Sequence, residues 1–273
     1  MKRIVVPIDF SEQSETALKL AATLAKKSNA ELFVLHMLEL SPGIMSNTEY
    51  IPQVHIVHLI KVTEDRLTKF LDKPHLKGIK ITPIIKHYKV FSEVNEVATK
   101  HKVDLIVMGS NGTDGLEEIF IGSNTERVVR NSEVPVLVVK GEVGSFKAER
   151  FVFASDFKEE SIPAAKKAIA FAELLGAELK LVYINTPADA FLSTEDTYDR
   201  ISKFLNIARI GKEVDIYNDY SVEKGILNYA ESQAADMIGI PTHGRKGLSH
   251  FFMGSIGEDI ANHSTIPVVT FKI

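Results

Sequence analysis

The residues best suited to chemistry are glycines and small polar side chains in one segment of the first half of the chain. Gly109 and Gly112 are followed by Gly122, Ser123 and Asn124 at the start of an expected helix. Glycine permits tight turns and lets the backbone approach a ligand closely. Free N–H groups and the helix dipole at a helix start favour an anion. The spacing predicts a phosphate site, in which the Ser123 hydroxyl adds a donor. The alternative is that these glycines only shape loops.

The elements around this segment alternate between strand and helix patterns. Short, β-branched, nearly continuous apolar runs are typical of parallel strands buried on both faces. In the first half they cover residues 3–8, 31–38, 80–85, 105–108 and 134–139, and helical patterns cover 14–27, 53–71, 91–102 and 124–130. Ser11 is expected to cap the first of these helices. In the second half, strand patterns cover 151–155, 179–184, 214–217, 237–240 and 267–271.

The second half of the chain repeats the first. Matching residues keep one spacing over long stretches, and they include glycines as well as apolar positions. Aligned pairs are Asp9 and Asp156, Asp104 and Asp236, Gly112 and Gly244, Gly122 and Gly254, Ser123 and Ser255, and Pro135 and Pro267. Asn29 and Gly176 also align, and both residue types tolerate the left-handed conformation that ends a helix. We therefore expect two domains, residues 1–144 and 145–273, joined by a linker at 141–147.

Alternating strands and helices predict an α/β fold. Each copy is expected to be a doubly wound open parallel sheet with helices on both faces. In such folds ligands bind at the carboxyl ends of the strands, close to the point where the strand order reverses. The segment from Gly109 to Asn124 follows the fourth strand, which places the expected phosphate site at that edge.

Composition excludes several classes of protein. The 273 residues are 45% hydrophobic and 25% charged, as in an ordinary globular protein. There is no cysteine, which excludes disulfides, thiolate metal sites and a cysteine nucleophile. A net charge of −4 without a basic tract argues against binding to nucleic acid or to an anionic membrane. No apolar run approaches the roughly 18 residues of a membrane span, and no targeting segment is visible, so we expect a cytoplasmic protein.

The pattern G-x2-G-x9-G-[S/T] lies between an apolar strand and a helix that leads into Pro-Val-Leu-Val-Val, and it resembles the universal stress protein family. The run Val-Pro-Ile-Asp-Phe-Ser on the first strand fits the family's N-terminal signature. Because the resemblance covers both copies, the chain is similar to the tandem-domain members. It implies five-stranded parallel sheets of order 3-2-1-4-5, and the motif marks the branch of the family that binds ATP.

In the first copy the resemblance assigns a role to each motif position. Asp9 is expected to face the ribose and phosphates, and Pro7 to shape the same strand end. Met37 lies on the strand whose backbone reads adenine, and Met108 is expected to pack on the base. The triphosphate is expected to be held by Gly109, Gly112, Gly122, Ser123 and Asn124. A divalent cation such as Mg²⁺ often accompanies such a nucleotide, and Asp9 could help to orient it.

The second copy departs from the pattern. Four positions that match the site are Asp156, Gly244, Gly254 and Ser255. However, Pro241 replaces the first glycine and Ala154 replaces Pro7. Proline removes an N–H donor and fixes φ at about −65°. A site that needs this donor, or a conformation open only to glycine, is therefore weakened, although Arg245 and Lys246 could offset a lost donor.

The sequence is compatible with three functions to different degrees. The expected one is a stress-response regulator that binds an adenine nucleotide and hydrolyses it slowly at most. An interaction scaffold without nucleotide fits the second copy better than the first. An ATP-hydrolysing or adenylating enzyme is disfavoured, because related pyrophosphatase folds carry Ser-Gly-Gly-x-Asp-Ser after the first strand, where this chain reads Asp-Phe-Ser-Glu. Walker A, G-x-G-x-x-G, G-x-S-x-G and H-E-x-x-H motifs are absent.

Histidines offer two weaker candidates. His55 and His58 have the spacing of two metal ligands on one helix face, but no third ligand is near in sequence, so no metal site is expected. His243 lies in a loop that could touch phosphate, but Asn111 takes its place in the first copy, so we expect no catalytic role.

The last strand of each copy is a hydrophobic sheet edge that needs covering. The resemblance implies that such edges pair across a dimer. Within this chain the two copies are therefore expected to pair as an intramolecular pseudo-dimer. A homodimer of whole chains stays open, and protein partners are not identified by the sequence.

Overall fold

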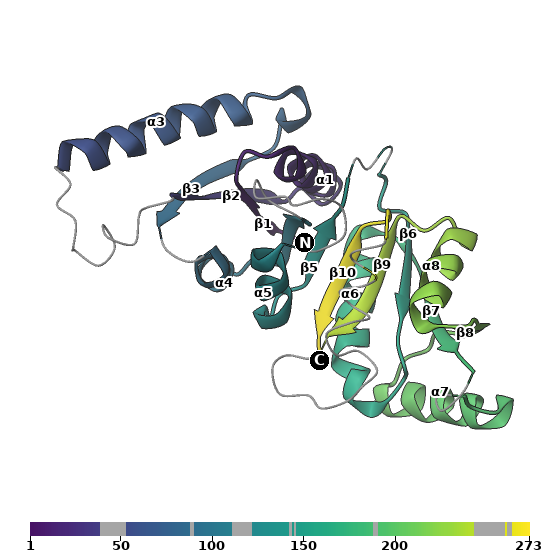
Figure 1. Cartoon of the computed structure of the whole chain (residues 1–273). Coiled ribbons are helices and arrows are strands. Elements are labelled where there is room, and N and C mark those ends of the chain that lie inside the picture. Colours follow the sequence, from purple (N-terminus) through teal and green to yellow (C-terminus); the bar gives the residue numbers. More distant parts are fainter. Residues whose placement is uncertain are drawn as a thin grey trace.

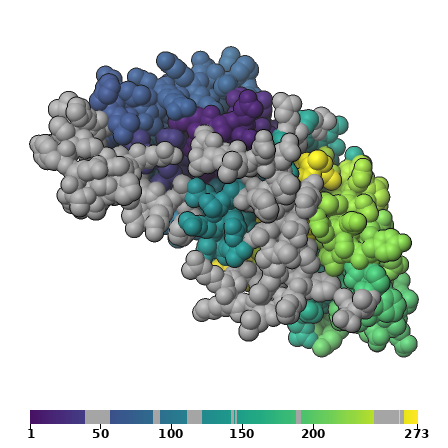
Figure 2. All heavy atoms as spheres, in the orientation of Figure 1, coloured from purple at the N-terminus to yellow at the C-terminus, as the bar shows by residue number. Residues whose placement is uncertain are grey.

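A computed structural model describes most of the chain. The described residues are 1–38, 53–87, 90–110, 122–141, 144, 146–187, 191–242, 260 and 264–273, with backbone only at 53–56, 87 and 90–91. The two copies form two lobes that lie side by side (Figures 1 and 2). We found no helix among these residues that is both long enough and apolar enough to cross a bilayer.

The strands form one continuous ten-stranded sheet of order β3-β2-β1-β4-β5-β10-β9-β6-β7-β8. Each copy contributes five parallel strands in the order 3-2-1-4-5, which confirms the expected fold. The strands of the first copy are β1 (Arg3–Ile8), β2 (Glu31–Leu38), β3 (Ile81–His87), β4 (Leu105–Gly109) and β5 (Val136–Val139). Those of the second are β6 (Arg150–Ala154), β7 (Glu178–Asn185), β8 (Val214–Asn218), β9 (Met237–Thr242) and β10 (Val268–Lys272).

Helices cover both faces of the sheet (Figure 1). On one face α1 (Glu12–Ser28), α3 (Gln53–Leu71), α6 (Ile162–Leu175) and α7 (Thr194–Ala208) share a single apolar core that runs through both copies. On the other face α4 (Val90–Lys100) and α5 (Ser123–Asn131) cover the first copy, and α8 (Val222–Ser232) covers the second. The apolar clusters on this face stay separate. The two copies are therefore fused through one face and through the sheet itself.

The junction of the copies is an antiparallel pair of edge strands. Val138 of β5 lies opposite Val268 of β10, and Val136 lies opposite Thr270. This pairing confirms the expected intramolecular pseudo-dimer, because each hydrophobic edge supplies the hydrogen-bonding partner that the other lacks. Since the pair is antiparallel, the strands of the two copies end at opposite edges of the common sheet. The carboxyl ends of the strands, where ligands are expected, consequently face in opposite directions in the two copies.

Helix ends follow the signals in the sequence. The Ser11 side chain accepts a hydrogen bond from the Ser14 N–H, so it caps α1 as expected. Asn29 and Gly176 end α1 and α6 in the left-handed conformation, with φ of 52° and 59°. The same closing geometry in both copies explains why these two positions align in the repeat.

Several other repeated residues serve the fold. The Asp104 carboxylate accepts hydrogen bonds from the N–H groups of Lys2 and Arg3, at 2.6 and 3.0 Å. Asp236 does the same in the second copy, where the donors are residues 149 and 150 at 2.9 Å. Each aspartate thus joins the start of the central strand to the start of its neighbour. Repetition of a polar residue in this chain therefore does not by itself mark a ligand site.

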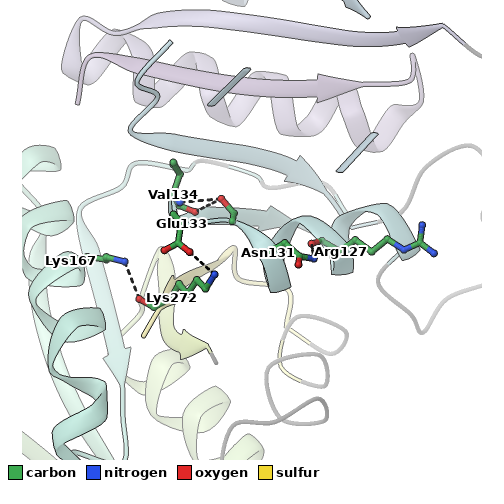
Figure 3. A network of polar contacts seen from close by, with 7 residues as sticks. Arg127, Asn131, Glu133, Val134, Lys167 and Lys272 are labelled. Atoms are coloured by element: carbon green, nitrogen blue, oxygen red, sulfur yellow. Dashed lines mark hydrogen bonds and ion pairs between the residues drawn. The ribbon is translucent and has the colours of Figure 1, made fainter. Parts of the chain in front are cut away.

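Polar contacts add to the junction, and Figure 3 shows them. The Lys272 ammonium lies 2.6 Å from a carboxylate oxygen of Glu133, which precedes β5. Lys167 of α6 donates to the Lys272 carbonyl at 3.0 Å. Since the Glu133 side chain is 77% exposed, the ion pair is expected to contribute about 0.5 kcal/mol. A double-mutant cycle of Glu133→Gln and Lys272→Ala, measured by urea unfolding, checks this value. A coupling free energy above about 2 kcal/mol would contradict it.

His75 is expected to make stability depend on pH. It lies in the short turn η1 (Pro74–Leu76), and its Nε2 is buried without a hydrogen-bond partner among the described residues. Burial, together with the nearby charge of Lys19, lowers the pKa of His75, while Glu15 acts in the opposite direction. The unfolded chain therefore binds a proton more readily, and stability falls as the pH drops through about 6.5. Urea unfolding of His75→Gln from about pH 5 to about pH 8 should show a weaker pH dependence than the wild type. Identical pH profiles would contradict this role.

Candidate functional site

The start of α5 is fixed onto the carboxyl end of β4. The Gly122 N–H donates to the Ser110 carbonyl at 2.7 Å, and the Thr125 hydroxyl donates to the Gly109 carbonyl at 2.9 Å. Ser110 itself donates to the Val139 carbonyl of β5 at 2.9 Å. These bonds bring Gly109 and the helix start together, as the spacing in the sequence predicts.

The donors at this helix start differ in one respect from the expectation. Gly122 is the residue that caps α5, and its own N–H is occupied by Ser110. The N–H groups of the first helical turn have no acceptor within the helix, because no helical carbonyl lies four residues before them. In α5 these belong to Ser123, Asn124 and Thr125, because the Glu126 N–H is the first to reach a carbonyl of the helix, that of Gly122. The side chains of Ser123 and Asn124 are exposed. The site therefore offers an anion the N–H groups that follow Gly122, together with the Ser123 hydroxyl.

The first turn of α1 lies against Gly109. A Cβ atom at Gly109 would lie 3.0 Å from the backbone carbon and oxygen of Gln13 in the first turn of α1. A side chain at this position would push α1 away from the strand end. The close approach brings the first turn of α1, which follows Asp9 in sequence, against the strand end to which α5 is fixed. Gly109 is thus required by packing as well as suited to a ligand.

Asp9 is oriented by the residue that caps α1. Its Oδ1 atom accepts hydrogen bonds from the N–H and the hydroxyl of Ser11, at 3.0 and 2.5 Å. The following residue, Phe10, has φ of 66°, a left-handed conformation that is uncommon for a bulky side chain. The centres of the Phe10 and His36 rings lie 4.3 Å apart. The Arg66 guanidinium lies 4.1 Å from the centre of the Phe10 ring. These contacts hold the turn that presents Asp9.

The other predicted residues of the first copy lie around the same strand ends. Pro7 is in β1 opposite Leu35 of β2, and it is buried. Met37 and Met108 belong to one apolar cluster on the face covered by α4 and α5, and they are 9% and 5% exposed. The structure therefore places both methionines on the same side of the sheet as the start of α5. Gly112 lies outside the described residues.

In the second copy the described part of the site differs from the first. Asp156 follows β6 as Asp9 follows β1, but it is only 4% exposed and its carboxylate pairs with Lys158 at 3.2 Å. Pro241 is buried in β9, opposite Phe271 of β10. Three residues that the sequence assigns to this site lie outside the described residues, namely Gly244, Gly254 and Ser255.

Sequence reasoning missed two participants in the site. The Thr125 hydroxyl fixes α5 to β4, and no motif marks a threonine that bonds to a carbonyl of another element. Lys158 was detectable, because it replaces Ser11 in the repeat and so puts a cation two residues after the aspartate. Among the described residues no group of three or more metal-ligating side chains is present. His58 is exposed on α3, and the side chain of His55 lies outside the description.

Comparison with known proteins decides the family. The sequence model of the universal stress protein family matches residues 1–140 and again residues 147–272. The chain belongs to the universal stress protein family. Universal stress protein MJ0531 of Methanocaldococcus jannaschii is 37% identical over 139 residues, which is 51% of this chain and 82% of that protein. Universal stress protein Slr1230 of Synechocystis is 23% identical over the full length of both chains.

Solved structures agree with two tandem universal stress protein domains. A crystal structure of a universal stress protein from Archaeoglobus fulgidus matches with a TM-score of 0.71 and 23% identity. The match covers 99% of this chain and 96% of that one, so it supports the fold of both copies together.

Proposed function

We propose that the first copy binds an adenine nucleotide, with ATP as the first candidate, and that binding regulates the protein. The observation that carries the proposal is the start of α5, fixed to the carboxyl end of β4, against which the first turn of α1 also packs just after Asp9. Helix N–H groups, a serine hydroxyl and a nearby carboxylate suit a phosphorylated ligand with a ribose. Membership of the universal stress protein family supports the same ligand class.

Each part of the site has a proposed task. The N–H groups after Gly122 and the Ser123 hydroxyl hold the phosphates, and Asp9 accepts hydrogen bonds from the ribose. The buried methionines Met37 and Met108 give the adenine an apolar surface on the α5 side of the sheet. The task of Gly112 stays a prediction from the sequence. Where Mg²⁺ accompanies the phosphates, Asp9 is its nearest proposed carboxylate.

Equilibrium dialysis of the purified chain against labelled ATP tests the proposal. We expect saturable binding at or below millimolar ATP, competed by ADP and AMP more strongly than by GTP. The same measurement with and without EDTA tests the contribution of Mg²⁺. Absence of retained nucleotide at millimolar ATP would contradict the proposal.

We propose a binding protein rather than a rapid enzyme. The carboxylate of the site is oriented by Ser11, and the Walker A, G-x-G-x-x-G, G-x-S-x-G and H-E-x-x-H motifs are absent from the sequence. Phosphate release from saturating ATP is therefore expected to stay below the median enzyme turnover of about 10 per second by several orders of magnitude. Fast turnover that depends on an added acceptor would favour the enzyme alternative.

A further inference from the structure

The two copies use the second residue after the strand-end aspartate in different ways. In the first copy this residue is Ser11, whose hydroxyl caps α1 by accepting from the Ser14 N–H at 3.1 Å. In the second copy it is Lys158, whose side chain makes no cap. Its ammonium lies instead 3.2 Å from Oδ2 of Asp156. A residue that starts a helix in one copy thus neutralises the aspartate in the other.

Both oxygens of Asp156 are engaged by groups of the protein. Oδ1 accepts a hydrogen bond from the Ser161 hydroxyl at 3.0 Å and another from the Lys158 N–H at 3.2 Å. Oδ2 faces the Lys158 ammonium, and the carboxylate side chain is 4% exposed. A ribose hydroxyl or a cation would have to displace these contacts before it reached the carboxylate. The lysine thus supplies from within the chain the positive charge that a buried carboxylate requires.

The backbone near Asp156 is rearranged as well. Residues Glu159–Ser161 form a 3-10 turn, and α6 begins only at Ile162, whereas α1 is regular from Glu12 onward. This turn is what places the Ser161 hydroxyl on Asp156. Pro241 occupies the place of Gly109, and proline has no N–H to donate. The substitutions at Lys158 and Pro241, together with the new contact of Ser161, whose counterpart Ser14 donates to the Ser11 carbonyl instead, reduce what the strand ends can offer a nucleotide.

We infer that the second copy is closed by its own residues, with Lys158 as the resident cation of Asp156, so that the chain binds one nucleotide in the first copy only. The inference rests on the proposed function for the number of nucleotides, but the ion pair itself can be tested alone. In this arrangement the second copy keeps the fold of the first, but its Asp156 stabilises the folded domain instead of contacting a ligand. It completes the sheet that covers the edge of the first copy.

The stoichiometry of nucleotide binding is the first test. Equilibrium dialysis of the full chain at saturating ATP is expected to give one nucleotide per chain for the wild type and none for Gly122→Asp. Two nucleotides per chain in the wild type, or one retained by Gly122→Asp, would overturn the inference. No binding by the wild type would contradict the proposed function instead, and the second test then decides whether the second copy is closed.

The second test measures the ion pair without any nucleotide. Lys158→Ser introduces the residue of the first copy, and it is expected to lower the urea midpoint in the wild-type background. In the Asp156→Asn background the same change is expected to have little effect, because the charge that needed a partner is gone. Lys158→Arg is the matched control and should keep the wild-type midpoint. Equal effects of Lys158→Ser in both backgrounds, or an Arg variant as unstable as the Ser variant, would overturn the inference.

Discussion

The Gly122→Asp variant is expected to lose nucleotide binding while the protein stays folded. A carboxylate at the start of α5 would face the phosphates of the proposed ligand. Two like charges about 4 Å apart repel by about 4 kcal/mol at an effective dielectric constant of about 20. That corresponds to a loss of about a thousandfold in affinity. Dialysis or calorimetry with ATP measures the loss.

The same substitution is expected to help the helix. Gly122 has φ of −57° and ψ of 143°, which any residue can adopt at a helix cap. Aspartate is a preferred capping residue, and its side chain would accept from the N–H groups of Asn124 or Thr125. Thermal stability should therefore be unchanged or slightly raised, which separates lost binding from misfolding.

Gly122→Asn is the matched control, because it adds nearly the same volume without the charge. We expect it to bind ATP more weakly than the wild type but much more tightly than Gly122→Asp. Equal losses in the Asn and Asp variants would show that bulk, and not charge, controls binding at this helix start. Unchanged affinity in the Asp variant would contradict the proposed phosphate site.

The core substitution Gly239→Ala is expected to lower the free energy of unfolding substantially. Gly239 lies in β9 below two buried rings, and a Cβ there would lie 2.5 Å from Cζ of Phe151 and 3.0 Å from Cδ2 of Phe153. The Phe151 ring also contacts the rings of Phe171 and Phe271, at centroid distances of 5.8 and 6.2 Å. It therefore has little room to move. Overpacking of this kind costs about 1–3 kcal/mol.

Urea unfolding measures this loss, and Gly211→Ala is its control. A Cβ at Gly211 meets nothing within 4 Å, so that variant should keep the wild-type midpoint. If Gly239→Ala unfolds at the same urea concentration as the wild type, the aromatic cluster is not tightly packed against β9.

Gly239 also shows how the two copies divide the same core volume. The equivalent residue of the first copy is Val107, and the positions of Phe151 and Phe153 are held there by Ile4 and Val6. The second copy thus has larger side chains at these two positions of its central strand, and a glycine at the facing position of the neighbouring strand. Total volume is kept while its distribution changes, which is what a close-packed core requires. Conservation of the fold between the copies did not need conservation of individual core residues.

Much of the fold was predictable because its signals are local. Continuous apolar runs mark strands buried on both faces, and the capping residues Ser11, Asn29 and Gly176 act within one turn of their own helix. The hydrophobic last strands indicated that these sheet edges need covering, and the resemblance predicted that they pair with each other, as β5 and β10 do. The order of the strands came from the resemblance, since neither periodicity nor spacing specifies which parallel strands are neighbours.

The candidate site was predictable in part. Spacing alone indicated that Gly109 and the start of α5 meet, and the structure joins them through Ser110 and Thr125. The tie made by Thr125 links residues of different elements, so no local pattern contains it. The roles of Asp9 and of the residues after Gly122 in binding a ligand stay predictions until nucleotide is measured.

The sequence by itself determined that this protein is one α/β domain written twice, with a complete glycine motif in the first copy and an altered one in the second. Those properties depend on residue types and their spacing along the chain. Only the tertiary structure decided what the repeated polar residues do. Asp104 and Asp236 bind backbone N–H groups at strand starts, whereas Asp156 is buried against Lys158 and Ser161. The physical reason is that the task of a carboxylate depends on its burial and on the donors around it, and both arise only when distant segments pack together.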